Sequence, residues 1–324
     1  MKLEHFKKIA GLVAVFAGMC SGLLAQEKID AIKVFNEGVE LMKASDVRAI
    51  ESFENCIKVC EQIGDSANDI KAKAIKVLPD LYFQKAFDLL TVDKKIDESL
   101  KASKKALEVS NKYGDTKTKE STQKIMVQAY STMASTFVTN KEFERAVQAY
   151  DSALMINPDH IPSIYNKALI YKGLDNASKF KEVIDMYIEK LKPAGDTVKI
   201  EQAMKIARDY FRIAGGKANQ ANKIADAINL LNTASKYGTD KNVYYQYASV
   251  YNKQKKFAIA AENAQKGLAL ETGTPEDKAK FFYELGSAQA GKGETGNACE
   301  SFKNSMLGPF LQASKAQRIN LKCQ

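Results

Sequence analysis

Side chains that commonly do chemistry are scarce in this chain of 324 residues, which contains 2 His and no Trp. His5 lies in an N-terminal segment with the features of a removed leader, so His160 would be the histidine of the mature protein. A metal centre built from several histidines therefore lacks ligands, and a Ser-His-Asp or Cys-His site would have to use His160. Because His160 follows Pro158-Asp159 in a connection between helices, we interpret it as a solvated loop residue.

Two other motifs that could indicate catalysis have simpler interpretations. Residues 291–296 match G-x-G-x-x-G, which binds dinucleotides where a strand precedes it and a helix follows it. Here a helical pattern precedes the glycines, which indicates a turn between helices. Acidic neighbours such as Glu142 and Glu144 are ordinary on a helix surface, and no pair is singled out as the facing couple that a glycosidase needs. We therefore predict a protein that is not an enzyme and that has no cofactor.

The cysteines of the mature chain form two pairs in the sequence. Cys56 and Cys60 are one helical turn apart, where a disulfide would be strained, so we predict buried thiols. Cys299 and Cys323 are better candidates for a disulfide, because a C-terminal helix packed on the preceding helical pair would bring them together. The spacing alone leaves all three pairings of four cysteines open.

Residues 1–25 have the features of a secretory signal peptide. Three lysines precede an apolar stretch over residues 9–19, and Ala25 supplies a small residue directly before the expected cleavage point. The apolar stretch is shorter than the ~20 residues that a membrane-spanning helix needs. We therefore expect cleavage rather than a membrane anchor, and no membrane span.

Export of the mature chain predicts a location in the periplasm or at the outer membrane of a Gram-negative bacterium. Lipidation at Cys20 is a less favoured alternative, because Met19 stands where a lipoprotein processing site usually has a small residue.

The composition favours a folded protein with a basic surface. Hydrophobic residues make up 45% of the chain and charged residues 27%, with a net charge of +9, values close to those of globular proteins. A basic surface could attract nucleic acid, anionic lipid or acidic protein. Because the lysines are scattered and export is expected, we predict a protein or peptide partner and no nucleic acid.

Almost every segment after residue 26 shows helical periodicity, and none shows sustained strand alternation. The sequence therefore predicts an all-α fold. A pattern of two helices recurs along the chain. In the first helix a large residue is followed by a small residue four positions later and by a second large residue three positions after that. In the second helix small or apolar residues recur at the same spacings. The clearest copy contains Tyr130, Ala134, Phe137, Ala146, Tyr150 and Ala153.

The last copy keeps the same internal offset. Ala298 follows Gly286 by the same twelve residues that separate Ala146 from Ala134, an agreement that chance rarely produces. Five weaker copies have their small central residue at Gly38, Ala86, Ala168, Ala207 and Ala248.

This pattern resembles the tetratricopeptide repeat family, whose unit of about 34 residues is a pair of antiparallel helices. The resemblance implies a right-handed superhelical solenoid of about seven helix-turn-helix repeats over residues 26–312. Residues 313–324 are predicted to form a capping helix that shields the last repeat.

Two segments disturb the regular spacing. Pro79 lies in an otherwise helical stretch, so we expect a helix start or a kink there, with residues 66–78 as extra helix or linker. The fifth copy has an excess of eight residues that includes Gly215-Gly216, and the sequence does not decide whether this segment is a hinge.

The resemblance also implies a binding surface, because the first helices of such repeats line the inner groove. The residue after each large opening residue is then expected to point into the groove: Phe35, Phe83, Ser131, Tyr165, Met204, Tyr245 and Tyr283. Polar neighbours that could bond a peptide backbone are Asn36, Gln84, Asn166, Gln246 and Glu284. The aromatic stripe is equally consistent with packing between neighbouring helices.

The favoured hypothesis is a non-enzymatic adaptor of the bacterial cell envelope that holds a peptide or protein segment in the groove. The alternative is an accessory subunit of a glycan-binding or cell-wall enzyme assembly, and a hydrolase is disfavoured because no nucleophile and base can be nominated. A clamp for C-terminal carboxylates, known in the family, is not supported because Ser131 and Ser135 stand where it needs Lys and Asn.

Overall fold

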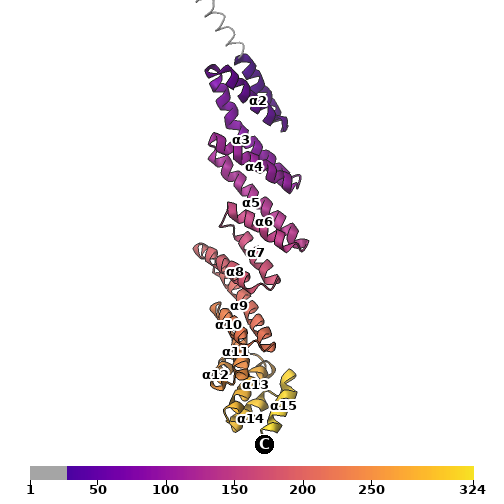
Figure 1. The fold of residues 1–324 in the computed structure, drawn as a ribbon, viewed down its shortest axis with the longest axis vertical. Helices are drawn as coiled ribbons and strands as arrows, with labels where there is room; N and C mark the ends of the chain where they lie inside the picture. Colours follow the sequence, from indigo (N-terminus) through magenta and orange to yellow (C-terminus); the bar gives the residue numbers. More distant parts are fainter. Residues whose placement is uncertain (1–27) are drawn as a thin grey trace, which may run out of the picture. The chain divides into compact units, whose positions relative to one another are not determined.

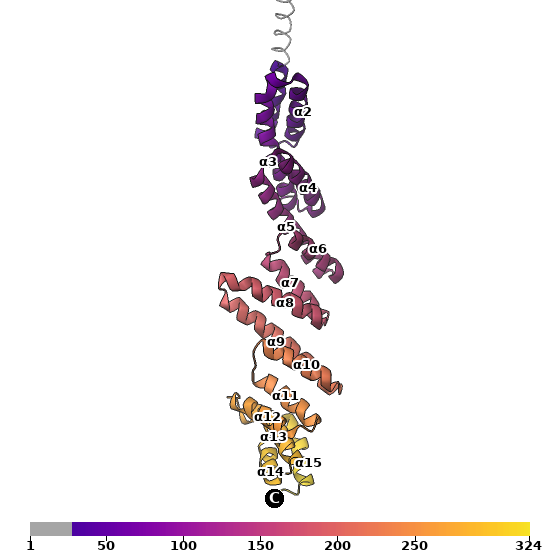
Figure 2. The same cartoon turned by 60° about the vertical axis from the view of Figure 1, so that its left-hand side comes forward.

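The computed structural model of the chain describes residues 28–324, and this part is built from helices without a strand (Figures 1 and 2). The predicted all-α repeat fold is confirmed. The expected signal peptide over residues 1–25, with Cys20, lies outside the described residues. Contacts divide the described residues into two compact units, of which the first ends at Ser163 and the second begins at Ile164.

The first unit begins with a helical segment over residues 28–43 and continues with five helices. These are α2 (Arg48–Ile63), α3 (Asn68–Thr91), α4 (Ile96–Tyr113), α5 (Thr116–Thr139) and α6 (Phe143–Ile156). Its last residues open α7 (Ile161–Gly173).

The second unit contains the rest of α7 and eight further helices. These are α8 (Ala177–Leu191), α9 (Thr197–Gln220), α10 (Ile224–Lys236), α11 (Lys241–Lys253), α12 (Phe257–Ala269), α13 (Pro275–Gly291), α14 (Thr295–Asn304) and α15 (Leu311–Asn320). Residues 291–296, the G-x-G-x-x-G motif, lie at the turn from α13 to α14, as the helical pattern indicated.

Small residues of one helix face large rings of the next, which is why the helices pair closely. A Cβ atom added at Gly38 would lie 3.1 Å from the ring of Phe53 in α2. The same addition at Gly286 in α13 would lie 3.0 Å from the ring of Phe302 in α14. Both rings are fully buried, so these pairs form the core within the first and last repeats.

The predicted register of the fifth repeat is wrong. Its small residue is Gly215 rather than Ala207, because a Cβ at Gly215 would lie 2.9 Å from Leu231 Cγ in α10. Ala227 follows Gly215 by twelve residues, the offset of the third, sixth and seventh repeats. The eight-residue excess is therefore not a loop: Gly215-Gly216 lies inside the continuous helix α9, which packs on α8 through Tyr210 and Phe180.

Of the helix start or kink expected at Pro79, the helix start is wrong. Helix α3 begins at Asn68 and runs through Pro79, so most of residues 66–78 are extra helix rather than linker. The proline lacks the amide hydrogen that would bond one turn back. The buried pyrrolidine ring packs in the core, and this packing holds the helix together where a backbone hydrogen bond is missing.

The C-terminal helix is fastened to the last repeat by covalent and polar contacts. Helix α15 covers Leu311–Asn320. It begins two residues before the predicted start of the capping helix at residue 313, and it ends four residues before the predicted end at residue 324. Cys299 and Cys323 form a disulfide with 5.6 Å between their Cα atoms. Arg318 Nη1 donates to the carbonyl oxygen of Cys299 at 2.6 Å. In the first unit Cys56 and Cys60 are buried free thiols, and burial raises the pKa of Cys56 to about 12.

Candidate functional site

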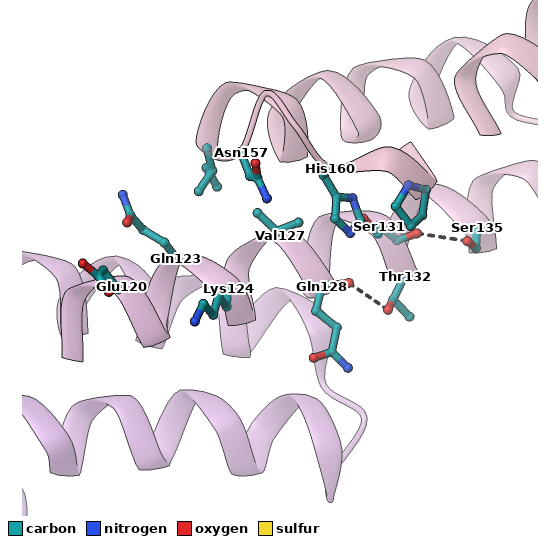
Figure 3. A pocket seen from close by; sticks show the side chains of 12 residues that line it. Glu120, Gln123, Lys124, Val127, Gln128, Ser131, Thr132, Ser135, Asn157 and His160 are labelled. Carbon is teal, nitrogen blue, oxygen red and sulfur yellow. Dashed lines mark hydrogen bonds between the residues drawn. The ribbon is translucent and has the colours of Figure 1, made fainter. Parts of the chain in front are cut away.

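A pocket of about 720 Å³ opens in the first unit, between α5 and the connection from α6 to α7 (Figure 3). Its volume falls in the range of ligand pockets. The lining residues from α5 are Glu120, Gln123, Lys124, Val127, Gln128, Ser131, Thr132 and Ser135. The connection and the start of α7 add Ile156, Asn157, His160 and Pro162.

Helix α5 presents these residues because they recur every three to four positions, on one side of the helix. The opposite side carries Thr122 and Ala129, which are fully buried. The helix start is fixed by Asp115, whose carboxylate accepts a hydrogen bond from the amide of Thr118 at 3.0 Å. The lining side chains are thus mounted on a helix held by the core and capped at its N-terminus.

Hydroxyl groups and one imidazole form a network at the inner end of the pocket. His160 Nδ1 lies 2.8 Å from Ser163 Oγ, and Ser163 Oγ lies 3.1 Å from Ser131 Oγ. Ser135 Oγ donates to the carbonyl oxygen of Ser131 at 3.0 Å, as drawn in Figure 3. The contact with Ser163 restrains the His160 ring through Nδ1, and Nε2 is the ring nitrogen that does not take part in it.

Charge at the pocket is balanced. Lys124 and Glu120 are exposed residues of its lining, and burial lowers the pKa of His160 below its ordinary value. The imidazole is therefore neutral at pH 7. His160 lies in the connection between α6 and α7, as expected, but it is half-buried rather than fully solvated.

The contact between His160 and Ser163 resembles the base and nucleophile of a hydrolase, but the burial of Ser163 argues against that role. Ser163 has no exposed surface, and its hydroxyl is already engaged by Ser131. A nucleophile must reach a reacting atom of the substrate. The arrangement therefore orients His160 rather than preparing Ser163 for attack.

The residues predicted to face the groove form ring contacts within each unit. In the first unit Phe35 contacts Phe53 at 5.5 Å between centroids, and Phe83 contacts Phe87 at 6.1 Å. Both predicted residues are half-buried. One part of each of these two rings therefore packs against another ring, and the exposed part of the ring is open to a ligand.

In the second unit the three predicted tyrosines behave in the same way. The ring contacts join Tyr165 to Tyr187 at 4.8 Å, Tyr245 to Phe281 at 6.0 Å and Tyr283 to Phe302 at 5.7 Å. Asn166 and Gln246 are half-buried on the same helices as these tyrosines. Gln246 lies against Gly216, where an added Cβ would be 3.1 Å from its side-chain oxygen.

The corrected register of α9 changes one member of the predicted groove. Counted from Gly215, the position that corresponds to Tyr245 is Arg212, which bonds Asp209 at 3.4 Å. Met204 lies two turns earlier, in the half of α9 that precedes the repeat. Its place among the groove residues followed from the wrong register.

Glu284, predicted as a polar groove residue, is instead buried. The relative solvent exposure of Glu284 is 7%. Asn252 Nδ2 donates a hydrogen bond to Glu284 Oε2 at 2.8 Å. Burial raises the pKa of Glu284, while hydrogen bonds from Asn252 and Ser249 and the charge of Lys253 oppose that shift. This carboxyl belongs to the contact between α11 and α13.

Sequence reasoning missed most of the pocket, including Gln123, Gln128 and Asn157. One signal was present: Ser131 interrupts a stripe that is otherwise mainly aromatic. A small residue at a position usually filled by a ring leaves space, and the structure shows where that space lies.

Among residues 28–324, no group of three or more His, Cys, Asp or Glu side chains could hold a metal ion. Over the same residues, no helix combines the length and the apolar character needed to cross a membrane.

Comparison with known proteins identifies the repeat that carries the pocket. The family model "Tetratricopeptide repeat" matches residues 127–160, which contain most of the pocket lining. No curated protein matches the chain.

Several solved structures are similar to the chain at low identity. MamA is 18% identical, with 60% of this chain and 94% of MamA covered and a TM-score of 0.36. YrrB, described as a TPR protein with an unusual peptide-binding site, is 20% identical over 55% of this chain and 84% of its own, with a TM-score of 0.33. A tetratricopeptide repeat protein from Parabacteroides merdae is 18% identical over 91% and 99% of the two chains, with a TM-score of 0.28.

Proposed function

We propose that this chain, a tetratricopeptide repeat protein, is a non-enzymatic scaffold that binds an extended segment of a partner protein. The observation that carries the proposal is the open pocket beside α5, in the repeat over residues 127–160. Its lining combines apolar walls with amide and hydroxyl groups, which suits the side chains and backbone of a peptide.

The absence of a nominated catalytic group supports a binding role. The one candidate pair, His160 and Ser163, has a buried hydroxyl, and the balanced charges of Lys124 and Glu120 create no strong field at the pocket. A rigid helix carrying small polar residues is suited to recognition.

We further propose that the scaffold acts in the bacterial cell envelope, on the strength of the signal-peptide features of residues 1–25. Mass spectrometry of the protein purified from its host tests this part. The mature chain should begin at Gln26 and be recovered with the envelope fraction. An intact N-terminus in the cytosolic fraction contradicts the envelope location and leaves the binding role untouched.

Site-specific photo-crosslinking in the native host tests the scaffold itself. A benzophenone amino acid replaces Gln128, an exposed residue of the pocket lining, and in a second variant it replaces Gln148. Gln148 is also an exposed glutamine of the matched repeat but lies on α6 outside the lining. The expected result is a discrete protein adduct at position 128 that is absent at position 148.

Three outcomes decide between the functions. Equal adducts at both positions, or none at position 128, contradict a scaffold that uses this pocket. An adduct of position 128 with glycan instead of protein supports the alternative of a subunit in a cell-wall assembly.

A further inference from the structure

The repeats differ at one position in a way that explains why the pocket exists. Counted from the small residue of each first helix, five of the seven repeats carry a ring there: Phe35, Phe83, Tyr165, Tyr245 and Tyr283. The fifth repeat carries Arg212, and the third carries Ser131. Each of the five rings contacts another ring within 6.1 Å, so the position is normally filled by an aromatic side chain.

At Ser131 no ring fills this space, and the pocket of about 720 Å³ opens there. The buried face and the N-terminal cap of α5 hold this helix in position, so it does not move to fill the space beside Ser131. The pocket therefore lies where the aromatic stripe lacks a ring, and a ligand can occupy it.

We propose that the pocket receives a tyrosine side chain from an extended segment of the partner protein, so that the partner completes the aromatic stripe. This inference rests on the proposed scaffold function and names the side chain that the scaffold recognises. Three features of the lining favour a tyrosine: its apolar walls, its hydrogen-bonding inner end and its balanced charge.

Apolar walls suit an aromatic ring. Val127, Ile156 and Pro162 line the pocket, and Figure 3 shows Val127 on α5 facing the connection that carries Asn157. Burying a ring against such walls is the main favourable contribution of an aromatic anchor.

The inner end suits a phenol hydroxyl in particular. The Nδ1 atom of His160 is occupied by Ser163, so Nε2 is either a donor or an acceptor according to the tautomer. A phenol hydroxyl both donates and accepts, and it can satisfy either tautomer. Phenylalanine or leucine would leave His160 Nε2 without a partner when the pocket is filled.

The charge balance argues against an acidic or phosphorylated side chain. One cation, Lys124, and one anion, Glu120, line the pocket, and the nearby imidazole is neutral. Binding a carboxylate or phosphate would require a cluster of Arg or Lys. Gln123, Gln128 and Asn157 can instead bond the neutral peptide backbone on either side of the tyrosine.

Nuclear magnetic resonance on the chain from Gln26 onward tests the inference with small probes. N-acetyl-L-tyrosinamide, N-acetyl-L-phenylalaninamide and N-acetyl-L-leucinamide are titrated in turn, and N,N′-diacetylchitobiose serves as a glycan probe. Tyrosinamide should shift the amide signals of Val127, Ser131 and Thr132. Its ring protons should show nuclear Overhauser effects to the methyl groups of Val127 and Ile156. It should bind about fivefold more tightly than phenylalaninamide, as one additional hydrogen bond implies.

A pair of variants localises the binding. Ser131→Tyr supplies the missing ring from the chain itself and should weaken tyrosinamide binding at least tenfold. Ser152→Tyr makes the same change on α6, where the serine hydroxyl bonds only back to Gln148 of its own helix, and binding should be unchanged. Thermal melts establish that both variants fold. If Ser131→Tyr does not fold, the Overhauser contacts of the unaltered protein decide the matter alone.

The inference is overturned if tyrosinamide produces no contacts with Val127 or Ile156, or if phenylalaninamide binds equally well. Tighter binding of diacetylchitobiose also overturns it, in favour of a glycan pocket. If the probes do not bind but a protein adduct forms at position 128, the proposed recognition of tyrosine is contradicted and the proposed scaffold function is retained. Probe binding without any protein adduct contradicts the scaffold function instead.

Discussion

Gly215 illustrates how a single hydrogen side chain sets the distance between two helices. A Cβ there would lie 2.9 Å from Leu231 Cγ and 3.2 Å from the carbonyl oxygen of Ala227. Leu231 is fully buried and cannot swing away. Gly215→Ala should therefore lower the free energy of unfolding by about 1–2 kcal/mol, since overpacking outweighs the better helix propensity of alanine. Urea denaturation followed by circular dichroism measures this change.

Gly173, the last residue of α7, provides the matched control, because a Cβ there meets nothing within 4 Å. Gly173→Ala should leave the stability unchanged or raise it slightly. Equal effects of the two substitutions would mean that Gly215 is not a point of close approach.

Glu284 makes the stability of the second unit depend on pH. Because burial raises its pKa in the folded state, its favourable contribution is present in full below the pKa of the unfolded chain. That contribution is lost as the pH rises through the folded pKa, at about 1.4 kcal/mol for each unit of the shift. Glu284→Gln keeps an oxygen for Asn252 and should melt at a higher temperature than the unaltered protein at pH 8, and at a similar temperature at pH 4.

Thermal melts of both proteins between pH 4 and pH 8 measure this difference. A constant difference in melting temperature across that range would show that Glu284 does not carry the pH dependence. The groups that act on the Glu284 carboxyl are Asn252, Ser249 and Lys253.

Among the elements, α15 depends most on a single covalent bond. The Cys299–Cys323 disulfide closes a loop with a sequence separation of 24 residues, and α15 buries only Ser314 fully. Replacing both cysteines by serine should lower the free energy of opening of α15 by about 3 kcal/mol, the value expected for a loop of this size. Hydrogen exchange should become faster over residues 311–324.

Exchange over α5 and α6 serves as an internal reference and should not change. Cys56 and Cys60, buried and free, remain in the variant, so added reductant should have no further effect on it. Unchanged exchange over residues 311–324 would show that Arg318 and Ser314 hold the helix without the disulfide.

Three helices of 24 residues, α3, α5 and α9, are longer than one repeat requires. In α9, Tyr210 contacts Phe180 of α8, and Gly215, five residues later, lies against Leu231 of α10. One long helix thus joins successive pairs without a separate linker. Periodicity predicted that these residues are helical, but it did not show which half faces which neighbour.

At the scale of the whole molecule, the main helix contacts join elements that are adjacent or next but one in the described chain. Stability in such proteins is a sum of repeat and nearest-neighbour contributions. Phe53→Ala, opposite Gly38, should cost about 3–5 kcal/mol of local stability. It should accelerate hydrogen exchange over residues 28–113 while leaving α13 and α14 unchanged.

Phe302→Ala, opposite Gly286, is the matched change in the other unit and should accelerate exchange over α13 and α14 while sparing α2 and α3. Mass spectrometry of exchanged peptides reads both outcomes in one experiment. A uniform increase over both units after either substitution would mean that the chain unfolds as a single cooperative body.

The sequence by itself determined the all-α class, the paired helices and most of the small residues at their close contacts. These features depend on periodicities of three to four residues, which are set locally by helix geometry. The sequence also contains Ser131 at a position where five repeats carry a ring, but it did not show the pocket beside it.

Only the tertiary structure decided which surfaces meet. It placed Gly215 rather than Ala207 against α10, carried α3 through Pro79 and buried Glu284 in a helix contact. It also opened the pocket between α5 and His160. Each outcome depends on contacts between residues distant in the sequence, and a local periodic pattern is the same whichever neighbour covers it.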